Sequence, residues 1–339
     1  MKPDDRAIDE AAALIREGEL VGIPTETVYG LGADALNPDA VRSIFEAKGR
    51  PGDNPLIVHI ARIEAIQELI AEAPSPAAQQ LARAFWPGPL TMIFPRGAQV
   101  PLRTTGGLET VAVRMPAHPV ARRLIERAQR PIAAPSGNRS GRPSPTTAAH
   151  MLQDMDGRIP LILDGGPCAV GVESTVVDMT APVPRILRPG GVTREQIAAV
   201  CGACEVDPAV MRPLREDEKP RSPGMKYRHY APAGALTLYR GARERVAEAI
   251  CAAYDAALDA GKRPLILALE GNRVLYGERS CESLGSDAQA MAQTVFSALR
   301  DADERRADVI FSESVEAEGI GLAVMNRLGR AAAFHIEEV

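Results

Sequence analysis

Residues 20–37 read LVGIPTETVYGLGADALN, and this stretch carries the first clear sign of the fold. A short apolar run, LVGI at 20–23, stops at Pro24 as a buried strand stops at a loop. Hydroxyl and acid side chains, an aromatic ring and a Gly-x-Gly follow at once, which is more polar chemistry than a turn needs. The stretch therefore predicts a strand that leads into a functional loop.

The rest of the chain up to about residue 200 alternates helical and strand patterns. Helical spacing of apolar residues predicts helices over 7–17, 38–48, 63–72, 76–86, 118–130 and 146–155. Short apolar runs predict strands over 20–23, 55–60, 91–94, 110–115, 131–135, 160–164, 174–179 and 185–188. This alternation indicates an α/β fold with a mixed, twisted sheet and helices packed on it.

A second unit begins after a stretch that has neither period. Residues 212–234, RPLREDEKPRSPGMKYRHYAPAG, are charged, Pro-rich and aperiodic, as linkers are. Strand patterns then alternate with helical patterns, over 235–239, 243–260, 264–269, 288–302, 308–314 and 319–331. This order predicts a small doubly wound, Rossmann-like domain, and the expected division is 1–207, a linker at 208–234, and 235–339.

The composition narrows the class of protein. A chain of 339 residues is too long for one typical core, which favours two domains. No apolar run approaches a membrane span, and the N-terminal MKPDDRAIDE has no signal-peptide character. Five scattered cysteines make no disulfide framework, and Cys201-x-x-Cys204 alone is weak evidence for a metal or redox site. We therefore expect a cytoplasmic enzyme with no membrane partner.

The charge is unevenly distributed along the chain. A net charge of −5 argues against nucleic-acid binding by the chain as a whole. Residues 111–145 nevertheless carry seven arginines and a single acid, Glu126. This arginine cluster fits a solvated helix face and a field for phosphates or RNA equally well, so both interpretations stay open.

Four stretches carry more polar groups than their places in the chain require. They are PTETVYGLGADA (24–35), KGRPGDNPLIVHI (48–60), APSGNRSGRPSPTT (134–147), and GVESTVVD with RPGG (171–178 and 188–191). All lie at junctions between loops and elements, where α/β proteins bind ligands. Guanidinium and ammonium groups beside Gly- and Ser-rich loops suit the binding of a polyanion.

Each stretch also has a structural explanation. Lys48 and Arg50 can be surface cations at a helix C-terminus, where the helix dipole favours them. His59 can be a core histidine, and Ser144 or Thr146 can cap the next helix. The P-loop, the complete Rossmann fingerprint, the zinc-deaminase ligand set and G-x-S-x-G are all missing from the sequence. Four such stretches in one chain favour a ligand site over four separate structural explanations.

These stretches, together with PGPLT (87–91) and VAVRMP (111–116), resemble the YrdC-type threonylcarbamoyl-AMP synthases. The resemblance runs in the same order over residues 7–202, which makes it more specific than any single motif. SPGMKYRHYAP (222–232) and the α/β domain after it are similar to the longer, two-domain form of that family. The resemblance implies a YrdC-like twisted sheet for the N-terminal domain.

The resemblance also implies a reaction. L-threonine, bicarbonate or CO2, and ATP would give threonylcarbamoyl-adenylate and pyrophosphate. A partner tRNA threonylcarbamoyl transferase would then modify the adenosine beside the anticodon. Mg²⁺ would be held mainly by the phosphates, because the motifs show no carboxylate cluster, so no protein ligand of a metal is assigned. The linker at 208–234 is expected, as a hypothesis, to cover the site as a lid.

The same resemblance implies roles for individual residues. Lys48 and Arg50, as the catalytic pair, match with Ser136 and Asn138 the K-x-R…S-x-N signature of the triphosphate site. Further ATP contacts are implied for Asn54, Thr110, Ser144, Arg188 and Tyr230. A threonine pocket is implied for Thr27, His59, Arg114, the backbone of Ala134, and Ser174. Bidentate geometry makes Arg114 a suitable partner for the threonine carboxylate, whereas Glu26 could orient Thr27 or meet the substrate amine.

Two other functions stay open at this point. The N-terminal unit could be an RNA-binding module of ribosome or tRNA maturation that makes no adenylate, with the arginine cluster as a weak RNA-binding surface. Alternatively, the same fold could transfer a carbamoyl group, as in domains of hydrogenase maturation. The zinc-finger and acylphosphatase modules that accompany those domains have no counterpart in this sequence.

Overall fold

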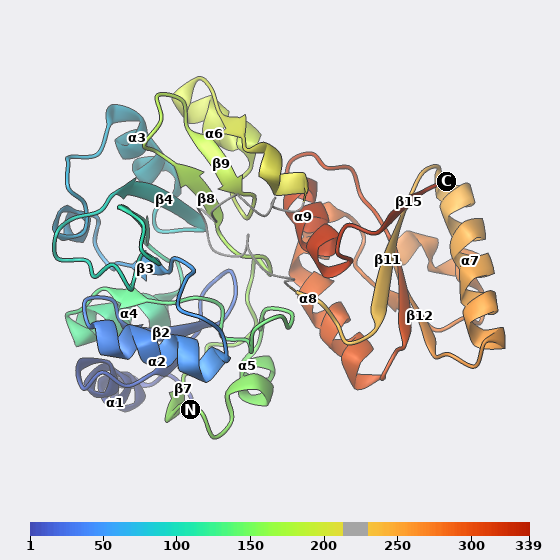
Figure 1. Ribbon diagram of the computed structural model, residues 1–339, viewed down its shortest axis with the longest axis horizontal. Coiled ribbons are helices and arrows are strands. Elements are labelled where there is room, and N and C mark those ends of the chain that lie inside the picture. Colours follow the sequence, from blue (N-terminus) through green and yellow to red (C-terminus); the bar gives the residue numbers. More distant parts are fainter. Residues whose placement is uncertain (213–229) are drawn as a thin grey trace. The chain divides into compact units, whose positions relative to one another are not determined.

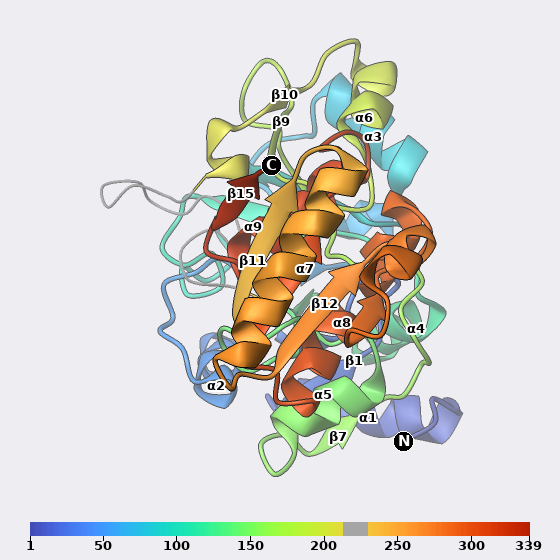
Figure 2. The same cartoon turned by 90° about the vertical axis from the view of Figure 1, so that its right-hand side faces the viewer.

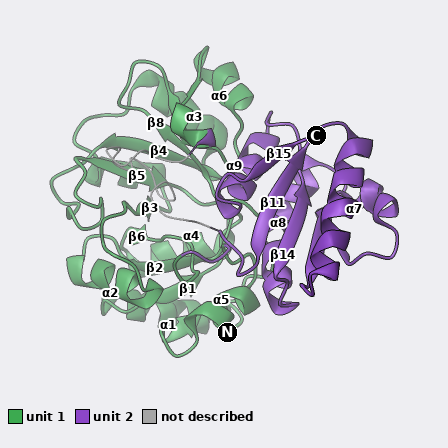
Figure 3. Cartoon of the chain, turned by 45° about the vertical axis from the view of Figure 1, so that its right-hand side comes forward, with its two compact units in different colours: residues 1–140, 144–210, 214–226 green, residues 141–143, 211–213, 227–339 purple. Residues whose placement is uncertain are grey.

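The structure, a computed structural model, describes residues 1–212 and 230–339 (Figure 1). Two compact units make it up (Figure 3). The first contains Met1–Ser140 and Ser144–Val210, and the second contains Gly141–Pro143 and the described chain from Tyr230 onward. Most of the predicted linker and lid, residues 213–229, lies outside the described residues, so the lid and the exact domain boundaries stay predictions.

A ten-stranded mixed sheet runs through the described part of the first unit. Its strand order is β10-β9-β8-β4-β5-β3-β6-β2-β1-β7. The strands are β1 (Val21–Ile23), β2 (Gly30–Asp34), β3 (Ile57–His59), β4 (Leu90–Pro95), β5 (Thr110–Arg114), β6 (Ile132–Ala133), β7 (Leu161–Ile162), β8 (Thr175–Asp178), β9 (Arg185–Arg188) and β10 (Glu205–Val206). Parallel and antiparallel pairs alternate irregularly across it, which confirms the predicted mixed sheet.

Capping residues fix where the helices of this unit begin. The helices are α1 (Asp5–Arg16), α2 (Pro38–Lys48), α3 (Pro76–Phe85), α4 (Pro119–Ala128), α5 (Ala148–Met155) and α6 (Arg194–Cys201), with 3₁₀ helices η1 (Ile63–Glu68) and η2 (Pro208–Met211). Asn37 caps α2 by accepting hydrogen bonds from the N–H groups of Asp39 and Ala40 at 3.0 and 3.2 Å. Pro38 fits the first turn because its missing N–H needs no partner there. The last residue of α2 is therefore held at a defined position, and that residue is Lys48.

Apolar packing joins α1 and α4 beneath one end of the sheet. Ala11 and Ile15 of α1 share a buried cluster with Leu124 and Ala128 of α4 and with Ile132 of β6. Burying one Leu or Ile side chain contributes about 1.5–3 kcal/mol. This cluster therefore holds α1 and α4 against β1 and β6, which Figure 3 labels.

The second unit is a five-stranded parallel sheet with helices on both faces. Its elements are β11 (Ala235–Arg240), α7 (Arg243–Asp259), β12 (Pro264–Ala268), η3 (Glu270–Tyr276), β13 (Cys281–Ser283), α8 (Ala288–Glu304), β14 (Val309–Glu313), α9 (Gly321–Ala331) and β15 (Ile336–Glu338). The strand order is β13-β12-β14-β11-β15, and every pair is parallel. Figures 1 and 2 show α7 on one face and α8 with α9 on the other. This arrangement confirms the predicted doubly wound domain.

Several local predictions were wrong. The helix expected over 63–72 is the 3₁₀ helix η1 and ends at Glu68, because the backbone of Leu69 and Ile70 bonds and bridges to Arg96 and Gly97 instead. The Gly-x-Gly after Tyr29 is not a turn but strand β2. Thr147, rather than Ser144 or Thr146, caps α5. The sequence patterns also missed α6, β10, β13 and β15, which are short or lie at sheet edges.

Candidate functional site

One face of the central sheet gathers most of the predicted threonine-site residues. Side chains two apart on a strand share a face, so His59 of β3 and Arg114 of β5 lie on the same side as Ile57 and Ala112. The register places His59 opposite Arg114, and Arg114 opposite Thr91 of β4. His59 and Arg114 are thus direct neighbours in the sheet although they are 55 positions apart in the sequence. The apolar cluster that contains Ile57 and Ala112 lies on the same face of the sheet.

Arg114 links the opening PTETVYG stretch to this face. Its guanidinium donates to the Thr27 hydroxyl at 2.9 Å, to the Glu26 carboxylate at 2.6 Å and to the Gly88 carbonyl at 3.2 Å. The second Glu26 oxygen accepts the Ala117 N–H at 3.1 Å. Both oxygens of Glu26 are engaged, and three of the five donors of Arg114 are used. Glu26 therefore holds Arg114, and Arg114 in turn holds Thr27.

The electrostatics of this pair favour the charged state of both groups. Burial by itself would raise the pKa of the Glu26 carboxyl, but the adjacent Arg114 charge and the hydrogen bonds that it and Ala117 donate leave that pKa below its ordinary value. Glu26 is 9% exposed and Arg114 is 3% exposed, so water screens the pair poorly. The ion pair is a rigid part of the site.

His59 is a buried, uncharged histidine. Burial, together with the nearby positive charge of Arg114, lowers its pKa to about 3. Its Nδ1 lies 3.3 Å from the Ile132 carbonyl oxygen, which can only accept a hydrogen bond. Nδ1 therefore carries the hydrogen, and Nε2 is left as an acceptor.

Ser174 and Arg188 form a second group of predicted site residues. The hydroxyl groups of Ser174 and Thr91 are 2.7 Å apart, which joins β4 to the start of β8. Arg188 of β9 donates to the Ser174 carbonyl at 3.0 Å and to its hydroxyl at 3.2 Å. The neighbouring Glu173 accepts a 2.6 Å hydrogen bond from Ser144. One buried hydrogen-bonded group thus connects residues that the sequence places in three separate stretches.

Thr91 and Glu173 were not among the predicted site residues. Both lie within stretches that were recognised, PGPLT and GVESTVVD. Thr91 lies in the apolar strand β4, and Glu173 lies just before β8. Both are buried polar side chains, and buried polar groups need partners, so a polar residue within or beside an apolar strand was the available signal.

Lys48 ties the end of α2 to the APSGNRSG loop. Its ammonium group donates at 2.5 Å to the Ser136 carbonyl and at 2.5 Å to the Asn138 carbonyl. The Ser140 N–H also donates to the Lys48 carbonyl at 3.0 Å. The two halves of the K-x-R…S-x-N signature are therefore adjacent, and Lys48 is only 3% exposed.

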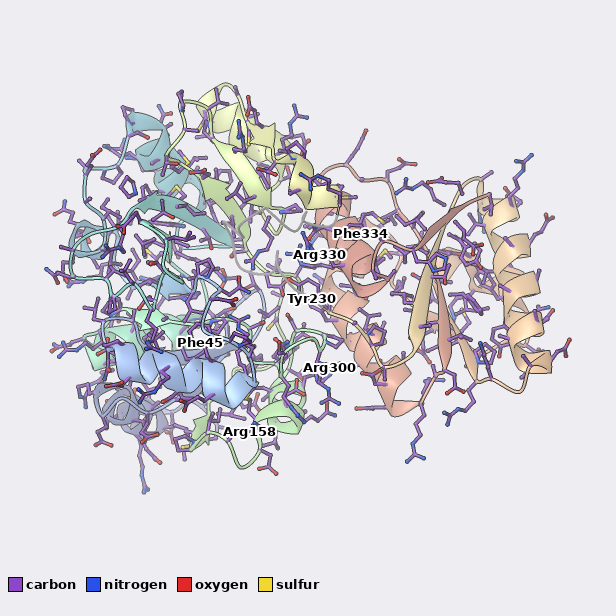
Figure 4. All side chains as sticks on the ribbon, in the orientation of Figure 1. Phe45, Arg158, Tyr230, Arg300, Arg330 and Phe334 are labelled. Carbon is purple, nitrogen blue, oxygen red and sulfur yellow. The ribbon has the colours of Figure 1, made fainter. Side chains whose placement is uncertain are left out.

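Arg50 and Asn54 lie in the loop that follows α2. The Arg50 guanidinium is 5.3 Å from the centre of the Phe45 ring, and Figure 4 labels Phe45 on α2. Arg50, Phe45 and Arg103 line an open groove of about 420 Å³. Asn54 is fully buried, and neither polar atom of its side-chain amide has a hydrogen-bond partner among the described residues. A buried amide without partners is costly, and it fits a site that a ligand fills.

Three other predicted contacts lie in different surroundings. Thr110 begins β5 and lines a small pocket of about 190 Å³ with Ile93 and Leu187. The Ala134 N–H donates to the Ile57 carbonyl at 3.0 Å. Tyr230 belongs to the second unit, where its ring lies 5.1 Å from that of Phe296 and 5.6 Å from the Arg327 guanidinium (Figure 4).

The arginine cluster at 111–145 is largely engaged with acids from other elements. Arg114 is buried in the site, as described above. On α4, Arg123 pairs with Asp5, Arg127 lies 3.5 Å from Asp9, and Arg130 just beyond the helix lies 3.4 Å from Asp34. Because these acids come from α1 and β2, the local excess of positive charge in the sequence is smaller in the folded protein.

The described residues show no feature of a protein-held metal. No group of three or more His, Cys, Asp and Glu side chains that could bind a metal ion occurs among them. Cys204 is buried, and burial raises its pKa to about 11, which opposes the thiolate that metal binding or redox chemistry needs. Within the described ranges, no helix is both long and apolar enough to cross a bilayer.

Comparisons with known proteins cover nearly the whole chain. A family model described as "Telomere recombination", of the Sua5/YciO/YrdC type, matches residues 13–190, and one described as "Threonylcarbamoyl-AMP synthase, C-terminal domain" matches residues 192–333. The threonylcarbamoyl-AMP synthase of Pyrococcus abyssi is 48% identical over 97% of this chain and 95% of its own length. The chain belongs to the threonylcarbamoyl-AMP synthase family. This confirms the resemblance, including the two-domain form.

Two further relatives of the family support this. The Bacillus subtilis threonylcarbamoyl-AMP synthase is 49% identical over 98% of this chain and 94% of its own length. The crystal structure of P. abyssi Sua5 complexed with L-threonine superposes with a TM-score of 0.93 at 48% identity, over 98% of this chain and 96% of that one. Family membership displaces both alternative functions as the main activity of the chain.

Proposed function

We propose that this chain joins L-threonine, bicarbonate or CO2, and ATP to form threonylcarbamoyl-AMP and pyrophosphate. The observation that carries the proposal is the convergence of the predicted residues within the first unit. Thr27, Arg114 and Glu26 form one hydrogen-bonded group, and Ser174 with Arg188 forms a second. Thr91 is the register neighbour of Arg114 and bonds Ser174, so the two groups are contiguous. The relative that was solved with L-threonine supports threonine as a substrate.

The threonine pocket would be built from Thr27, His59, Arg114, Ser174 and the backbone of Ala134. Two donors of Arg114 remain for the threonine carboxylate after its bonds to the protein are counted. Because Glu26 balances the charge of Arg114, these donors would orient the carboxylate more than attract it. With Nδ1 directed at the Ile132 carbonyl, the Nε2 of His59 would accept a hydrogen bond from the substrate. Each oxygen of Glu26 already accepts one hydrogen bond from the protein, which favours a supporting role for Glu26 over a contact with the amine.

The triphosphate would lie along Lys48, Arg50, Ser136 and Asn138. Asn54, Ser144 and Arg188 would add polar contacts, and Tyr230 stays a predicted contact of the nucleotide. Thr110 would border the base, since the pocket that it lines has apolar walls at Ile93 and Leu187 against which a flat ring can pack.

The mechanism has no covalent intermediate with the enzyme. The threonine amine adds to the carbon of CO2 and loses a proton, which gives a carbamate. A carbamate oxygen then attacks the α-phosphorus in line, and the bond from that phosphorus to the bridging oxygen breaks as pyrophosphate leaves. Lys48 and Arg50 would stabilise the charge that develops on the phosphates, and the pocket would supply the orientation.

Mg²⁺ is expected to accompany ATP. The described residues offer no carboxylate cage, so the phosphates would provide most of its ligands. Bound in this way, the ion would neutralise phosphate charge. The positions that the protein fixes are those of Lys48, Arg50 and Asn138.

The product is expected to pass to a tRNA threonylcarbamoyl transferase in the cytoplasm. A mixed anhydride of a carbamate and AMP is a reactive acyl donor, so a reaction that consumes it by transfer to a nucleophile must follow. Weak RNA binding by α4 stays a prediction. If α4 contributes, RNA affinity should fall steeply with salt, whereas adenylate formation should not.

Identification of the product by mass tests the proposed function directly. After incubation with ATP, threonine and ¹³C-bicarbonate, a species with the mass of threonylcarbamoyl-AMP is expected, and it should carry one labelled carbon. Omitting threonine should abolish both this species and pyrophosphate release. Formation of AMP without threonine, or an unlabelled adduct, would contradict the proposal.

The state of His59 leads to a prediction about pH. Because the pKa of His59 is about 3, the ring stays neutral at and above pH 6, and the KM for threonine should not rise between pH 8 and pH 6. An inflection near the ordinary histidine value of 6.5 would contradict this assignment. His59→Asn keeps a donor near the position of Nδ1 but lacks Nε2, so the KM for threonine should rise about ten-fold while the KM for ATP is unchanged.

A further inference from the structure

The side-chain amide of Asn54, a predicted nucleotide contact, gains little support from the rest of the described protein. Its amide makes no hydrogen bond among the described residues, although the residue is fully buried. Hydrogen bonds to its side chain from the described residues therefore do not orient it. Its orientation must come from its backbone and from whatever packs on that backbone.

The loop Leu102–Leu108, LRTTGGL, packs on that backbone and is itself tightly bonded. The Thr105 hydroxyl donates to the carbonyls of Leu102 and Leu108, at 3.2 and 2.7 Å. The Gly107 N–H donates to the Leu102 carbonyl at 2.8 Å. Thr104 anchors the loop, since its hydroxyl donates to the Ala35 carbonyl at 2.8 Å and its own carbonyl accepts the Leu56 N–H at 2.9 Å. The loop is a rigid unit that is joined to the Asn54 segment.

Gly106 is the point of closest approach between the loop and Asn54. A Cβ on Gly106 would lie 2.8 Å from the Pro55 nitrogen and 2.9 Å from the Asn54 carbonyl carbon. Both are backbone atoms, so neither can rotate away as the end of a side chain could. The neighbouring Gly107 also has a left-handed backbone, with φ of 83° against 61° for Gly106, but a Cβ there would meet nothing within 4 Å. The two glycines therefore share a left-handed backbone conformation, but only at Gly106 would an added Cβ collide with a neighbouring backbone.

We propose that Gly106 is a positioning residue for Asn54. By lacking a side chain, Gly106 lets the loop seat directly on the Asn54–Pro55 peptide and thereby fixes the direction of the unpartnered amide. This inference rests on the proposed function, in which that amide contacts ATP. The loop also continues into β5, whose first residue is Thr110, so one rigid segment places two predicted nucleotide contacts. Arg114 lies at the other end of β5 and is held by the pairing of that strand with β3 and β4, so threonine binding is expected to change little.

The test compares Gly106→Ala with Gly107→Ala in the full chain. Both variants carry the strain of alanine in a left-handed conformation, but only the first collides with the Asn54 backbone. A displacement near 1 Å can lower a rate by about a hundred-fold, so we expect Gly106→Ala to lose about that factor in kcat/KM for ATP. Gly107→Ala should stay close to the parent protein, and the KM for threonine should be similar in all three proteins. Equal effects of the two substitutions would overturn the proposal.

Two more variants separate this inference from the assignment of Asn54. If Gly106 acts through Asn54, then Asn54→Ala and Asn54→Ala with Gly106→Ala should show the same loss in kcat/KM for ATP. An additional loss in the double variant would overturn the positioning role while leaving Asn54 as a contact. Normal ATP kinetics in Asn54→Ala would show that Asn54 does not contact the nucleotide, and the positioning role of Gly106 would then be wrong as well. Product formation by the parent protein tests the proposed function independently of both.

If Gly106→Ala does not fold, Thr105→Val provides the same test without a collision. Valine has the shape of threonine but lacks the hydroxyl that bonds the carbonyls of Leu102 and Leu108. The loosened loop should lower kcat/KM for ATP and leave the KM for threonine unchanged. A purely structural role would lower thermal stability without this split between the two substrates, and that outcome would overturn the proposal.

Discussion

Lys48→Ala is expected to lower threonine-dependent pyrophosphate release by about a thousand-fold, because it removes a buried cation from the proposed phosphate site. The ammonium group also donates to the carbonyls of Ser136 and Asn138, so its loss would free the loop that carries both residues. The effect should appear mainly in kcat, since the charge matters most when pyrophosphate leaves. Steady-state release of pyrophosphate at saturating ATP and threonine measures it.

Arg83→Ala is the matched control for that substitution. Arg83 is an exposed cation in the last turn of another helix, α3, and its removal should leave activity near that of the parent. Lys48→Arg should restore little, because the planar guanidinium is larger than the ammonium group that fits between two carbonyls at 2.5 Å. Activity in Lys48→Ala within about ten-fold of the parent would exclude Lys48 as a catalytic residue, since one charge-stabilising donor is normally worth more than that.

Which residues of the candidate site lie together was easier to predict from the sequence than which partners connect them. Lys48, Ser136 and Asn138 were grouped from a motif, and the structure joins them by hydrogen bonds. Thr91 escaped notice because its importance depends on which strands are adjacent. β4 pairs with β8, whose first residue is 84 positions after Thr91, and a pairing over that separation cannot be predicted from the local sequence. The periodicity of apolar residues indicates which side chains are buried, but the hydrogen-bond partner of a buried hydroxyl group depends on the tertiary structure.

The secondary structure was also predicted well where the signal is local and poorly where it depends on tertiary contacts. Long amphipathic helices such as α1 and α2 were predicted nearly to their ends, because the apolar period and the caps are local. The strand β2 was interpreted as a loop, since GLGAD has the composition of a turn. In the structure Gly32 is needed there, because a Cβ would lie 3.0 Å from Ile132 and 3.3 Å from the Val21 carbonyl. Close approach of neighbouring strands overrode the local propensity.

Glu26 is the residue for which the structure changes the interpretation most. The sequence left open whether Glu26 orients Thr27 or meets the substrate amine. Each of its two oxygens accepts one hydrogen bond, from Arg114 and from the Ala117 N–H, and these bonds favour the first alternative, in which Glu26 acts on Thr27 through Arg114. A carboxylate in this place is part of the support of the pocket. Its removal should therefore affect folding before it affects chemistry.

Glu26→Ala is accordingly expected to destabilise the first unit by about 3–5 kcal/mol, because it leaves the Arg114 charge buried without its partner. The free energy of unfolding from urea titration measures the loss. Glu205→Ala breaks the exposed ion pair with Arg185, at 2.8 Å, and serves as the control with a much smaller expected effect. Similar losses in the two variants would show that the buried pair has no special role.

The pH dependence of Glu26→Gln gives the sharper form of this test. The folded pKa of Glu26 lies below its ordinary value of 4.5, so its contribution to stability is complete above pH 4.5 and is lost as the pH falls through the folded pKa. The parent should therefore be more stable than Glu26→Gln at pH 7, and the difference should shrink as the pH is lowered below 4.5. A protonated carboxyl and an amide are both neutral, which is why the two proteins should converge in acid. A difference that is constant with pH would mean that Glu26 stabilises the pocket through its shape and not through its charge on Arg114.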